Sequence, residues 1–277
     1  MQAPFFQQIA LLDRLGFSGM MQLVYTDPPF YSGKVQKADA GAFVDRWPTL
    51  TAYLEFIRTY MVSILPLLAP TGFFVLHCDY HASHYIKVIG DEVFGYENFR
   101  NEIVWHYTGR RTPAGLRVNS KHDVLLIWAR SGAARMQPLS DPWGREHYIR
   151  MKKQQVHVDE NGREWIWGHK GRGQSHAYRI YIDEAVRQGR YIDSVWDMPI
   201  IAISSKERTG YPTQKPVQLL DRVVELLTTP GQWVGDFMAG SGTTGVAAVS
   251  RGRPVVLGDS NPDAVAIIRR RMAQITR

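Results

Sequence analysis

The sequence predicts an α/β protein built on a parallel sheet. Short apolar runs alternate with segments of helical periodicity, the pattern of repeated strand and helix units. Two of the runs end in residues that stop regular structure, one at Asp27-Pro28-Pro29-Phe30 and one at a glycine-rich turn after Asp236. At 277 residues the chain is long enough for one large α/β domain, or for such a core with a sizeable insertion.

Six apolar runs are the predicted strands. They lie at residues 21–27, 72–79, 101–107, 122–129, 232–240 and 253–259. Their spacing leaves room for a covering helix between most successive strands, which is why a parallel arrangement is predicted.

Three segments are predicted as helices. Residues 1–16 read as a short amphipathic helix, and Ala42 to Leu68 carries apolar residues at helical spacing until Pro70-Thr71-Gly72 ends the pattern. Residues 216–227 are predicted as a further helix. Pro216 is compatible with its first turn, because an N–H group at that position would have no hydrogen-bond partner within the helix.

The character of the chain changes between about residues 131 and 200. Strong apolar runs give way to a mixture of basic, aromatic and glycine residues with weak periodicity. We interpret this range as an insertion into the α/β core that faces solvent or a ligand.

Charge and cysteine content narrow the class of protein. The net charge of +7 suits a polyanionic partner such as nucleic acid. The single cysteine, Cys78, excludes an intramolecular disulfide and a cysteine-based zinc cage and indicates a reducing compartment, so a cytoplasmic location is predicted. No stretch approaches the ~20 apolar residues of a membrane span, and the N-terminus has no signal-peptide pattern. No membrane partner is expected.

The segment from Trp233 to Gly252 has the form strand, glycine turn, helix. Gly240 and Gly242 permit close backbone approach, and Thr243 and Thr244 can cap the helix. The next strand ends in an acid, Asp259, which can accept hydrogen bonds from the ribose of an adenosine cofactor. A glycine turn alone is common, but its coupling to this acid favours a nucleoside cofactor. The turn lacks the ATP and NAD patterns, which leaves S-adenosylmethionine.

The Asp27-Pro28-Pro29-Phe30 segment suits methylation of an exocyclic amine. Such an amine of adenine or cytosine is a poor nucleophile and needs acceptors for both N–H bonds. Asp27 can accept one and the Pro28 carbonyl the other, since the two prolines hold the chain extended. Phe30 would stack on the base, and positioning and electrostatics would drive in-line attack on the methyl group. A plain turn after a strand is the alternative, but the glycine loop makes amine chemistry the better interpretation.

With these motifs in this order, the sequence resembles the β-class amino-methyltransferases of DNA, of the bacterial type III or prophage-borne kind. The resemblance implies a Rossmann-like, S-adenosylmethionine-dependent methyltransferase sheet, mostly parallel with one antiparallel strand and with an inserted target-recognition region. It implies a catalytic half of the core at 1–130, the target-recognition insertion at 131–200 and a cofactor-binding half at 201–277.

The resemblance also implies a set of cofactor residues. The segment "GYPTQKPVQLLDRVV" is similar to a family motif near the methionine carboxylate of the cofactor, and it supplies Gln214, Lys215 and Pro216. The segment "DFMAGSGTT" is similar to the family's cofactor loop, and it supplies Asp236, Phe237, Ala239, Gly240, Ser241, Gly242, Thr243 and Thr244. Asp259 would hold the ribose.

Two departures from the family pattern stand out. After Asp236 the chain has Phe237-Met238 where the family has Pro-Phe, which would displace the ring by one position. Residues 1–22 contain no Gly-Asp pair, whose acid contacts the cofactor adenine in the family. Weaker cofactor binding is therefore predicted.

Two basic regions are predicted to contact DNA. They comprise a loop with Arg110, Arg111, Arg117 and Lys121, and a part of the insertion with Lys152, Lys153, Lys170 and Arg172. The basic side chains would neutralise phosphates. Their contacts would offset the cost of flipping the target base into the site.

A cluster of histidines follows the second strand but predicts no metal site. His77 and His81 are four residues apart, which on a helix would place two ligands on one face. His77 and Cys78 finish a strand, however, so a pocket-wall or structural role is predicted for both. Asp79 is expected near the cofactor, and His81 and His84 are expected to face solvent.

The predicted function is methylation of the N6 amine of adenine in double-stranded DNA, because the aspartate form of the motif favours adenine. The alternatives are an N4-cytosine enzyme, an enzyme acting on RNA or a protein amide, and a DNA-binding modification subunit that is catalytically weak. The resemblance adds a homodimer and a restriction subunit as partners to consider, and a bacterial or phage-borne origin.

Overall fold

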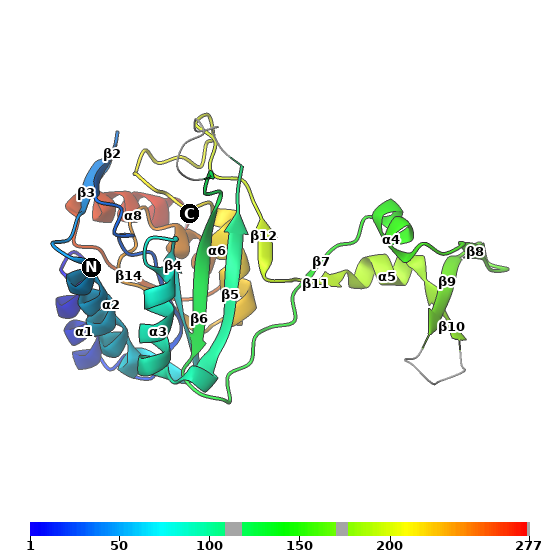
Figure 1. Ribbon diagram of the computed structural model, residues 1–277, viewed down its shortest axis with the longest axis horizontal. Coiled ribbons are helices and arrows are strands. Elements are labelled where there is room, and N and C mark those ends of the chain that lie inside the picture. Colours follow the sequence, from blue (N-terminus) through cyan, green and yellow to red (C-terminus); the bar gives the residue numbers. More distant parts are fainter. Residues whose placement is uncertain (109–117, 170–176, 276–277) are drawn as a thin grey trace. The chain divides into compact units, whose positions relative to one another are not determined.

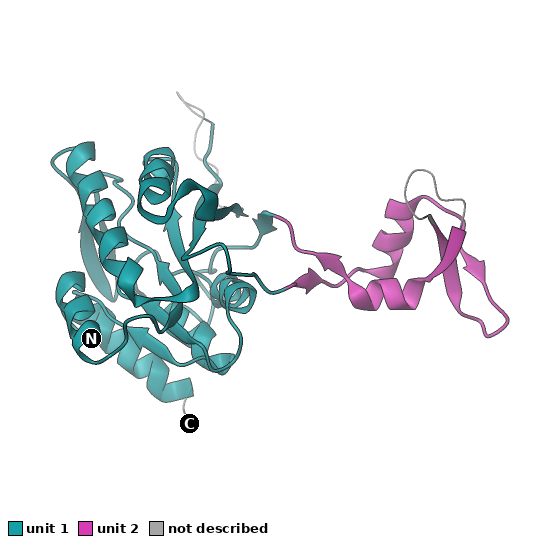
Figure 2. Cartoon of the chain, turned by 90° about the horizontal axis from the view of Figure 1, so that it is seen from below, with its two compact units in different colours: residues 1–137, 194–277 teal, residues 138–193 magenta. Residues whose placement is uncertain are grey.

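The computed structural model describes residues 1–108, 118–169 and 177–275, which form two compact units (Figure 2). The larger unit contains residues 1–137 and 194–277, and the smaller contains residues 138–193. The smaller unit is thus an insertion that lies within the range 131–200 marked by the sequence. No helix in the described ranges has both the length and the apolar character needed to cross a membrane.

A seven-stranded sheet forms the centre of the larger unit, in the order β12-β5-β6-β4-β1-β13-β14 (Figure 1). Its strands are β1 Met21–Thr26, β4 Leu68–Cys78, β5 Phe99–His106, β6 His122–Ala129, β12 Val195–Asp197, β13 Trp233–Asp236 and β14 Val255–Leu257. Strand β6 is antiparallel to β4 and β5, and the other neighbours are parallel. The predicted fold class is confirmed: an α/β, Rossmann-like sheet, mostly parallel with one antiparallel strand.

Helices cover both faces of this sheet (Figure 1). One face carries α1 Phe5–Arg14, α2 Leu50–Ile64 and α3 Ser83–Phe94, with the short 3-10 turns Leu65–Leu67 and Tyr96–Asn98. The other carries α6 Val217–Leu227, α7 Thr243–Ser250 and α8 Pro262–Ile275. The main hydrophobic core joins α1, α2 and α3 to β1, β4 and β6. This burial makes the sheet a rigid base for the loops at its edges.

The second strand of a β-hairpin occupies the start of the range 42–68, which was predicted as one long helix. Strands β2 Lys34–Ala38 and β3 Gly41–Asp45 pair antiparallel, and α2 begins only at Leu50. The side chain of Thr49 accepts a hydrogen bond from the Ala52 amide at 3.1 Å, so Thr49 is the true N-cap of this helix. The prediction of helix from Ala42 is wrong because Phe43 and Trp47 match helical spacing by chance, ahead of a proline and a cap.

The smaller unit has its own core. Its elements are β7 Ser140–Asp141, α4 Arg145–Lys152, β8 His157–Val158, β9 Glu164–His169, β10 Ala177–Tyr181, α5 Ile182–Gln188 and β11 Arg190–Tyr191. Strands β10, β9 and β8 form an antiparallel sheet, and Tyr148, Ile166 and Ile182 are buried between this sheet and the helices. Strands β7 and β11 pair where the chain enters and leaves the unit.

The packing of α3 on the sheet generates a stability prediction. A Cβ atom at Gly90 would lie 2.1 Å from Cζ2 of Trp128, which is fully buried on β6. We expect Gly90→Ala to lower the free energy of unfolding by about 2 to 3 kcal/mol, because a packed ring must move. Chemical denaturation measures this change. Gly132→Ala is the matched control, since nothing lies within 4 Å of its Cβ position, and an equal loss there would contradict the explanation.

Candidate active site

A cavity of about 750 Å³ opens at the carboxyl edge of the sheet in the larger unit. Its walls come from the segments that follow β1, β4, β13 and β14 and from the β2–β3 hairpin. In open α/β sheets, ligands bind in the crevice outside the carboxyl ends of the strands. The proline segment and the glycine loop therefore share one site.

The Asp27-Pro28-Pro29-Phe30 segment follows β1 directly and lines the cavity. The Pro29 carbonyl accepts a hydrogen bond from the hydroxyl of Tyr53 in α2, at 2.8 Å. Within the described ranges, no hydrogen bond reaches the carbonyl of Pro28.

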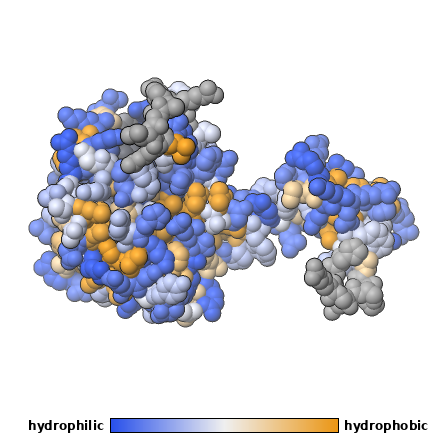
Figure 3. Space-filling view, viewed as in Figure 1, coloured by the Kyte–Doolittle hydropathy of each residue, from blue (hydrophilic) through white to orange (hydrophobic). Residues whose placement is uncertain are grey.

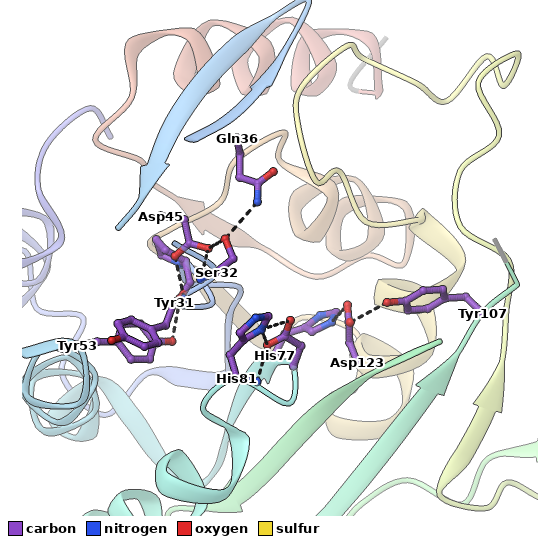
Figure 4. A network of polar contacts seen from close by, with 11 residues as sticks. Tyr31, Ser32, Gln36, Asp45, Tyr53, His77, His81, Tyr107 and Asp123 are labelled. Atoms are coloured by element: carbon purple, nitrogen blue, oxygen red, sulfur yellow. Dashed lines mark hydrogen bonds and ion pairs between the residues drawn. The ribbon is translucent and has the colours of Figure 1, made fainter. Parts of the chain in front are cut away.

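The turn after this segment is held from the hairpin. Tyr31 has a φ of 64°, a left-handed conformation that is uncommon for a residue with a side chain. The two carboxylate oxygens of Asp45 on β3 accept the amides of Tyr31 and Ser32 at 2.8 and 3.0 Å, and Asp45 also accepts the Ser32 hydroxyl (Figure 4). These bonds offset the strain of the turn. The hairpin thus holds the loop that carries Asp27.

Asp27 forms an ion pair with a residue from the far end of the chain. The Nζ atom of Lys215 lies 2.7 and 2.6 Å from the two carboxylate oxygens. The same Nζ lies 5.0 Å from the centroid of the Phe30 ring. The Lys215 side chain is 10% exposed and that of Asp27 is 21% exposed, so each compensates the burial of the other. The sequence predicted Lys215 for the carboxylate of the cofactor, whereas its ammonium group here binds the carboxylate of Asp27.

The glycine loop needs glycine at two positions. Gly240 has a φ of 49° and Gly242 a φ of 75°. The amide of Gly240 donates to Oδ2 of Asp259 at 2.8 Å. A Cβ atom at Gly242 would lie 2.8 Å from Cγ1 of Ile268 in α8. The backbone of the loop therefore passes close to both the second acidic strand end and the covering helix.

Asp236 is buried at the start of this loop. Its Oδ2 accepts the Thr244 hydroxyl at 2.6 Å, and its Oδ1 accepts the Met238 amide at 3.2 Å. Burial raises the pKa of Asp236 to about 8, and the two hydrogen bonds only partly oppose this rise. A cationic ligand group in the cavity would favour the ionised carboxylate.

The two threonines do not cap the helix as predicted. No side chain caps α7, whose N-cap is Gly242 itself. Instead the Thr243 hydroxyl donates to the Lys215 carbonyl at 3.2 Å, and the Thr244 hydroxyl donates to Asp236. Because Gly242 in the αL conformation takes the N-cap position itself, Thr243 and Thr244 fall inside the helix and their hydroxyls bond to neighbouring segments. The threonines thereby connect the glycine loop to Lys215 and Asp236.

Most of the predicted site residues lie around this one cavity. Those that line it are Asp27, Pro28, Pro29, Phe30, Gln214, Lys215, Asp236, Phe237, Ala239, Gly240, Ser241, Thr243, Thr244 and Asp259. Pro216 and Gly242 are not among the lining residues, because each precedes the first residue of a helix. The Gln214 amide group is used within its own loop, accepting from Thr209 and donating to the Glu207 carbonyl.

Several lining residues were not predicted. The hairpin contributes Gln36, Phe43 and Val44, and the segment before Gln214 contributes Tyr211 and Thr213. Phe43 and Val44 were missed because residues 42–68 were interpreted as helix, and Gln36 was missed because no strand was predicted at residues 34–38. Tyr211 could have been suspected, since it stands just before the Gln214-Lys215-Pro216 motif.

A family model described as DNA methylase matches residues 21–270 of the chain. The chain belongs to the DNA methylase family. This membership confirms the predicted family and the prediction of an S-adenosylmethionine-dependent DNA methyltransferase.

Individual relatives of this DNA methylase agree over most of its length. It is 37% identical over 255 residues to the DNA adenine methyltransferase YhdJ of Escherichia coli K12, covering 91% of this chain and 76% of that protein. It is 22% identical to the type II methyltransferase M2.DpnII of Streptococcus pneumoniae, covering 91% and 82%.

Solved structures support the fold. The chain resembles the M1.HpyAVI–SAM complex with a TM-score of 0.59 at 18% identity, covering 98% of this chain and 97% of that one. It resembles the cytosine-N4-specific PvuII DNA methyltransferase with a TM-score of 0.59 at 15% identity, covering 94% and 84%. At these identities the likeness concerns the fold alone.

The N-terminal segment of this DNA methylase runs beside Asp259. The Ala3 amide donates to the Asp259 carbonyl at 3.1 Å, and the Asp259 amide donates to the Met1 carbonyl at 3.0 Å. The next residues, Pro4, Phe5 and Phe6, line the cavity. The wall that lacks the Gly-Asp acid is therefore apolar, and weaker cofactor binding stays a prediction. The Phe237 ring is buried in the core while Met238 also lines the cavity.

The histidine cluster divides between core and cavity. His77 is fully buried at the end of β4. Nδ1 of His81 lies 2.8 Å from Oδ1 of Asp79, and both residues line the cavity, so the prediction that His81 faces solvent is wrong. The ring turns back because Asp79 offers it a partner. His84 is exposed. Among the described residues, no group of three or more histidine, cysteine, aspartate and glutamate side chains could hold a metal ion.

The predicted DNA contacts fall partly outside the described residues, namely at Arg110, Arg111, Arg117, Lys170 and Arg172. Lys152 and Lys153 are exposed at the end of α4 in the smaller unit, and Nζ of Lys152 lies 5.4 Å from the centroid of the Tyr148 ring. Lys121 lies just before β6, where its carbonyl accepts the Tyr107 amide at 3.0 Å.

The raised pKa of Asp236 predicts a pH dependence of stability. Between its unfolded value of 3.8 and its folded value of about 8, the folded chain keeps a proton that the unfolded chain has lost. The free energy of unfolding should therefore fall as pH rises through this window. Denaturation of the wild type and of Asp236→Asn between pH 5 and pH 8 isolates this contribution. If the two proteins lose stability in parallel, Asp236 is not the group responsible.

Proposed function

We propose that this DNA methylase transfers the methyl group of S-adenosylmethionine to the N6 amine of adenine in double-stranded DNA. The observation that supports it most is that the amine-binding segment at Asp27 and the glycine loop at Gly240 open into one cavity. A nucleophile held by the first would face an electrophile held by the second.

The residues around the cavity fit the cofactor chemically. Asp259 offers acceptors to the ribose hydroxyls, and the buried Asp236 can become the carboxylate that an ammonium group needs. Phe6, Phe43 and Val44 offer apolar surface to a purine. When bound, S-adenosylmethionine supplies an activated methyl group on a sulfonium.

The chain's own groups then prepare the amine. Asp27 accepts a hydrogen bond from one N–H group of the amine while Lys215 remains bound to it, because each carboxylate oxygen has two lone pairs. The Pro28 carbonyl accepts a hydrogen bond from the second N–H group. Both acceptors are held before the substrate arrives, Asp27 by its ion pair and the segment by the Tyr53 hydroxyl, so little reorganisation is needed. The Phe30 ring stacks on the base.

Adenine is favoured over cytosine by two observations. Residue 27 is the aspartate of the motif, and a relative with 37% identity is named a DNA adenine methyltransferase. Mass spectrometry of nucleosides from DNA of a host that expresses the protein decides the base, since N4-methylcytosine without N6-methyladenine would overturn the choice. Sequencing of the same DNA would give the recognition site.

Two substitutions separate catalysis from cofactor binding. Asp27→Ala should lower methyl transfer by about 100-fold or more, because it removes a preorganised acceptor, and should leave cofactor binding intact. Asp236→Ala should abolish cofactor binding as measured by thermal shift. Labelled-methyl transfer to duplex DNA provides the activity measurement, with RNA as the competing acceptor.

The exposed Glu55 on α2 offers a matched control for these carboxylate deletions. Glu55→Ala should behave as the wild type in both assays. Undiminished transfer by Asp27→Ala would exclude the proposed amine-binding role, and transfer to RNA alone would exclude DNA as the substrate.

The smaller unit is proposed to be the target-recognition region. In the sequence, the proposed catalytic half precedes it and the proposed cofactor-binding half follows it. Its exposed Lys152 would contact a phosphate. Lys152→Gln should then weaken DNA binding about equally for all sequences and reduce the slope of log affinity against log salt by about 1. Fluorescence anisotropy at several salt concentrations measures both. Arg14→Gln, at an exposed residue of α1, is the control, and an unchanged slope in Lys152→Gln would reject the contact.

A homodimer, a restriction subunit and a cytoplasmic location remain predictions. Figure 3 shows hydrophobic surface in the region of α2 and α3, two helices that pack together. Val62 on α2 and Val88 on α3 are exposed. Such surface would support association of two copies, which sedimentation velocity can measure.

A further inference from the structure

Four side chains next to the Asp27-Pro28-Pro29-Phe30 segment form a continuous series of hydrogen bonds. The Tyr25 hydroxyl is 2.7 Å from Nδ1 of His77, and Nε2 of His77 is 3.1 Å from Oδ2 of Asp123. Oδ1 of Asp123 accepts the hydroxyl of Tyr107 at 2.9 Å. Figure 4 shows His77, Asp123 and Tyr107 in this succession. Tyr25 lies on β1, His77 on β4 and Asp123 at the start of β6, and Tyr107 directly follows β5. The hydrogen bonds therefore cross four neighbouring strands of the sheet.

The ionisation of Asp123 and Tyr25 indicates which groups in this series of hydrogen bonds act as donors. Burial opposes ionisation of Asp123, but the hydrogen bond and the charge of His77 hold its pKa below the usual value, so Asp123 accepts on both oxygens. Burial raises the pKa of Tyr25 well above its usual value, so its hydroxyl is neutral. Nε2 of His77 therefore donates to Asp123, and Nδ1 of the same ring pairs with the Tyr25 hydroxyl. Both ring nitrogens are engaged, which fixes the plane of the imidazole.

The fixed ring lies against the catalytic segment. The centroids of the His77 and Phe30 rings are 5.7 Å apart, with an angle of 33° between their planes. The edge of the His77 ring also meets Trp105, with centroids 5.7 Å apart at 83°. Phe30 is partly exposed in the cavity and has no polar atom that could orient its own ring.

We propose that His77 is a positioning residue for methyl transfer, which sets the orientation of the Phe30 ring against the flipped base. This inference rests on the proposed function. An apolar residue at position 77 would fill the same space without burying polar groups, but it would leave its own plane and that of Phe30 free to vary. Hydrogen bonds at both nitrogens remove that freedom and hold the supporting ring in one orientation. Tyr25 and Asp123 act through His77.

A double-mutant cycle tests the proposal. His77→Leu should lower the single-turnover rate constant of methyl transfer by about 10- to 100-fold, the order expected of a misplaced reacting group. It should change the dissociation constant of S-adenosylmethionine by no more than about twofold, because His77 makes no contact with the cofactor in this proposal, and losing a contact worth about 1.4 kcal/mol would change that constant tenfold. In a Phe30→Ala background the same substitution should have no further effect, because the ring through which it acts is gone.

Base stacking provides a second measurement. Duplex DNA with 2-aminopurine at the target adenine, in the recognition site found by sequencing, fluoresces when the base leaves the stack. Phe30 should quench this signal by stacking. His77→Leu and Phe30→Ala should therefore both give brighter complexes than the wild type. A purely structural role would lower stability and leave the fluorescence of the folded complex unchanged.

Two further variants provide a milder disruption of the same hydrogen bonds and a surface control. Tyr25→Phe removes one hydroxyl and no volume from the cavity wall, so it should fold even if His77→Leu does not, and it should shift rate and fluorescence in the same direction by less. His84→Leu repeats the substitution at an exposed histidine of α3 and should match the wild type.

The outcomes separate the two proposals. If the wild type methylates adenine and the effects of His77→Leu and Phe30→Ala multiply, the role of His77 is rejected and the function stands. The same holds if Tyr25→Phe changes neither rate nor fluorescence. If the wild type transfers no methyl group to DNA, both proposals fall together.

Discussion

The parallel pairing of β1 with β13 is the constraint on which the site depends. Val24 pairs with Gly235, so the two strands end side by side although they lie at opposite ends of the chain. Asp27 follows the first strand and Asp236 ends the second. Every later feature of the cavity uses this juxtaposition, because a parallel sheet collects the loops of neighbouring strands at one edge.

From this pairing follows the ion pair between Asp27 and Lys215. Lys215 stands just before α6, and its carbonyl is bound by Thr243 of the glycine loop. Its ammonium group binds Asp27. One residue thus connects the Asp27-Pro28-Pro29-Phe30 segment to the glycine loop. Because both side chains are largely buried, loss of either would leave an uncompensated charge in the cavity.

The segment from Asp27 to Tyr31 is supported from three directions. Tyr53 of α2 binds the Pro29 carbonyl, Asp45 of the hairpin binds the turn at Tyr31, and His77 of β4 lies against Phe30. The supporting groups come from elements anchored in the sheet or in its main core. Such support matters for a reaction driven by positioning, because a small displacement of the reacting groups is costly.

The sequence alone determined the fold class, the two motifs and the segments at Asp27 and Asp236 that line the cavity, because apolar periodicity and glycine or proline chemistry are local properties. Strand runs such as 72–79 and 122–129 were recognisable for this reason. The tertiary structure decided what depends on partners distant in the chain: that Lys215 binds Asp27, that Thr244 binds Asp236, and that His81 turns to Asp79. The hairpin at residues 34–45 was also not predicted, since the residues from 42 onward have helical spacing, and only the pairing of the two strands and the contact of Asp45 with Tyr31 reveal it. Local pattern specifies which groups are present, and packing determines which of them meet.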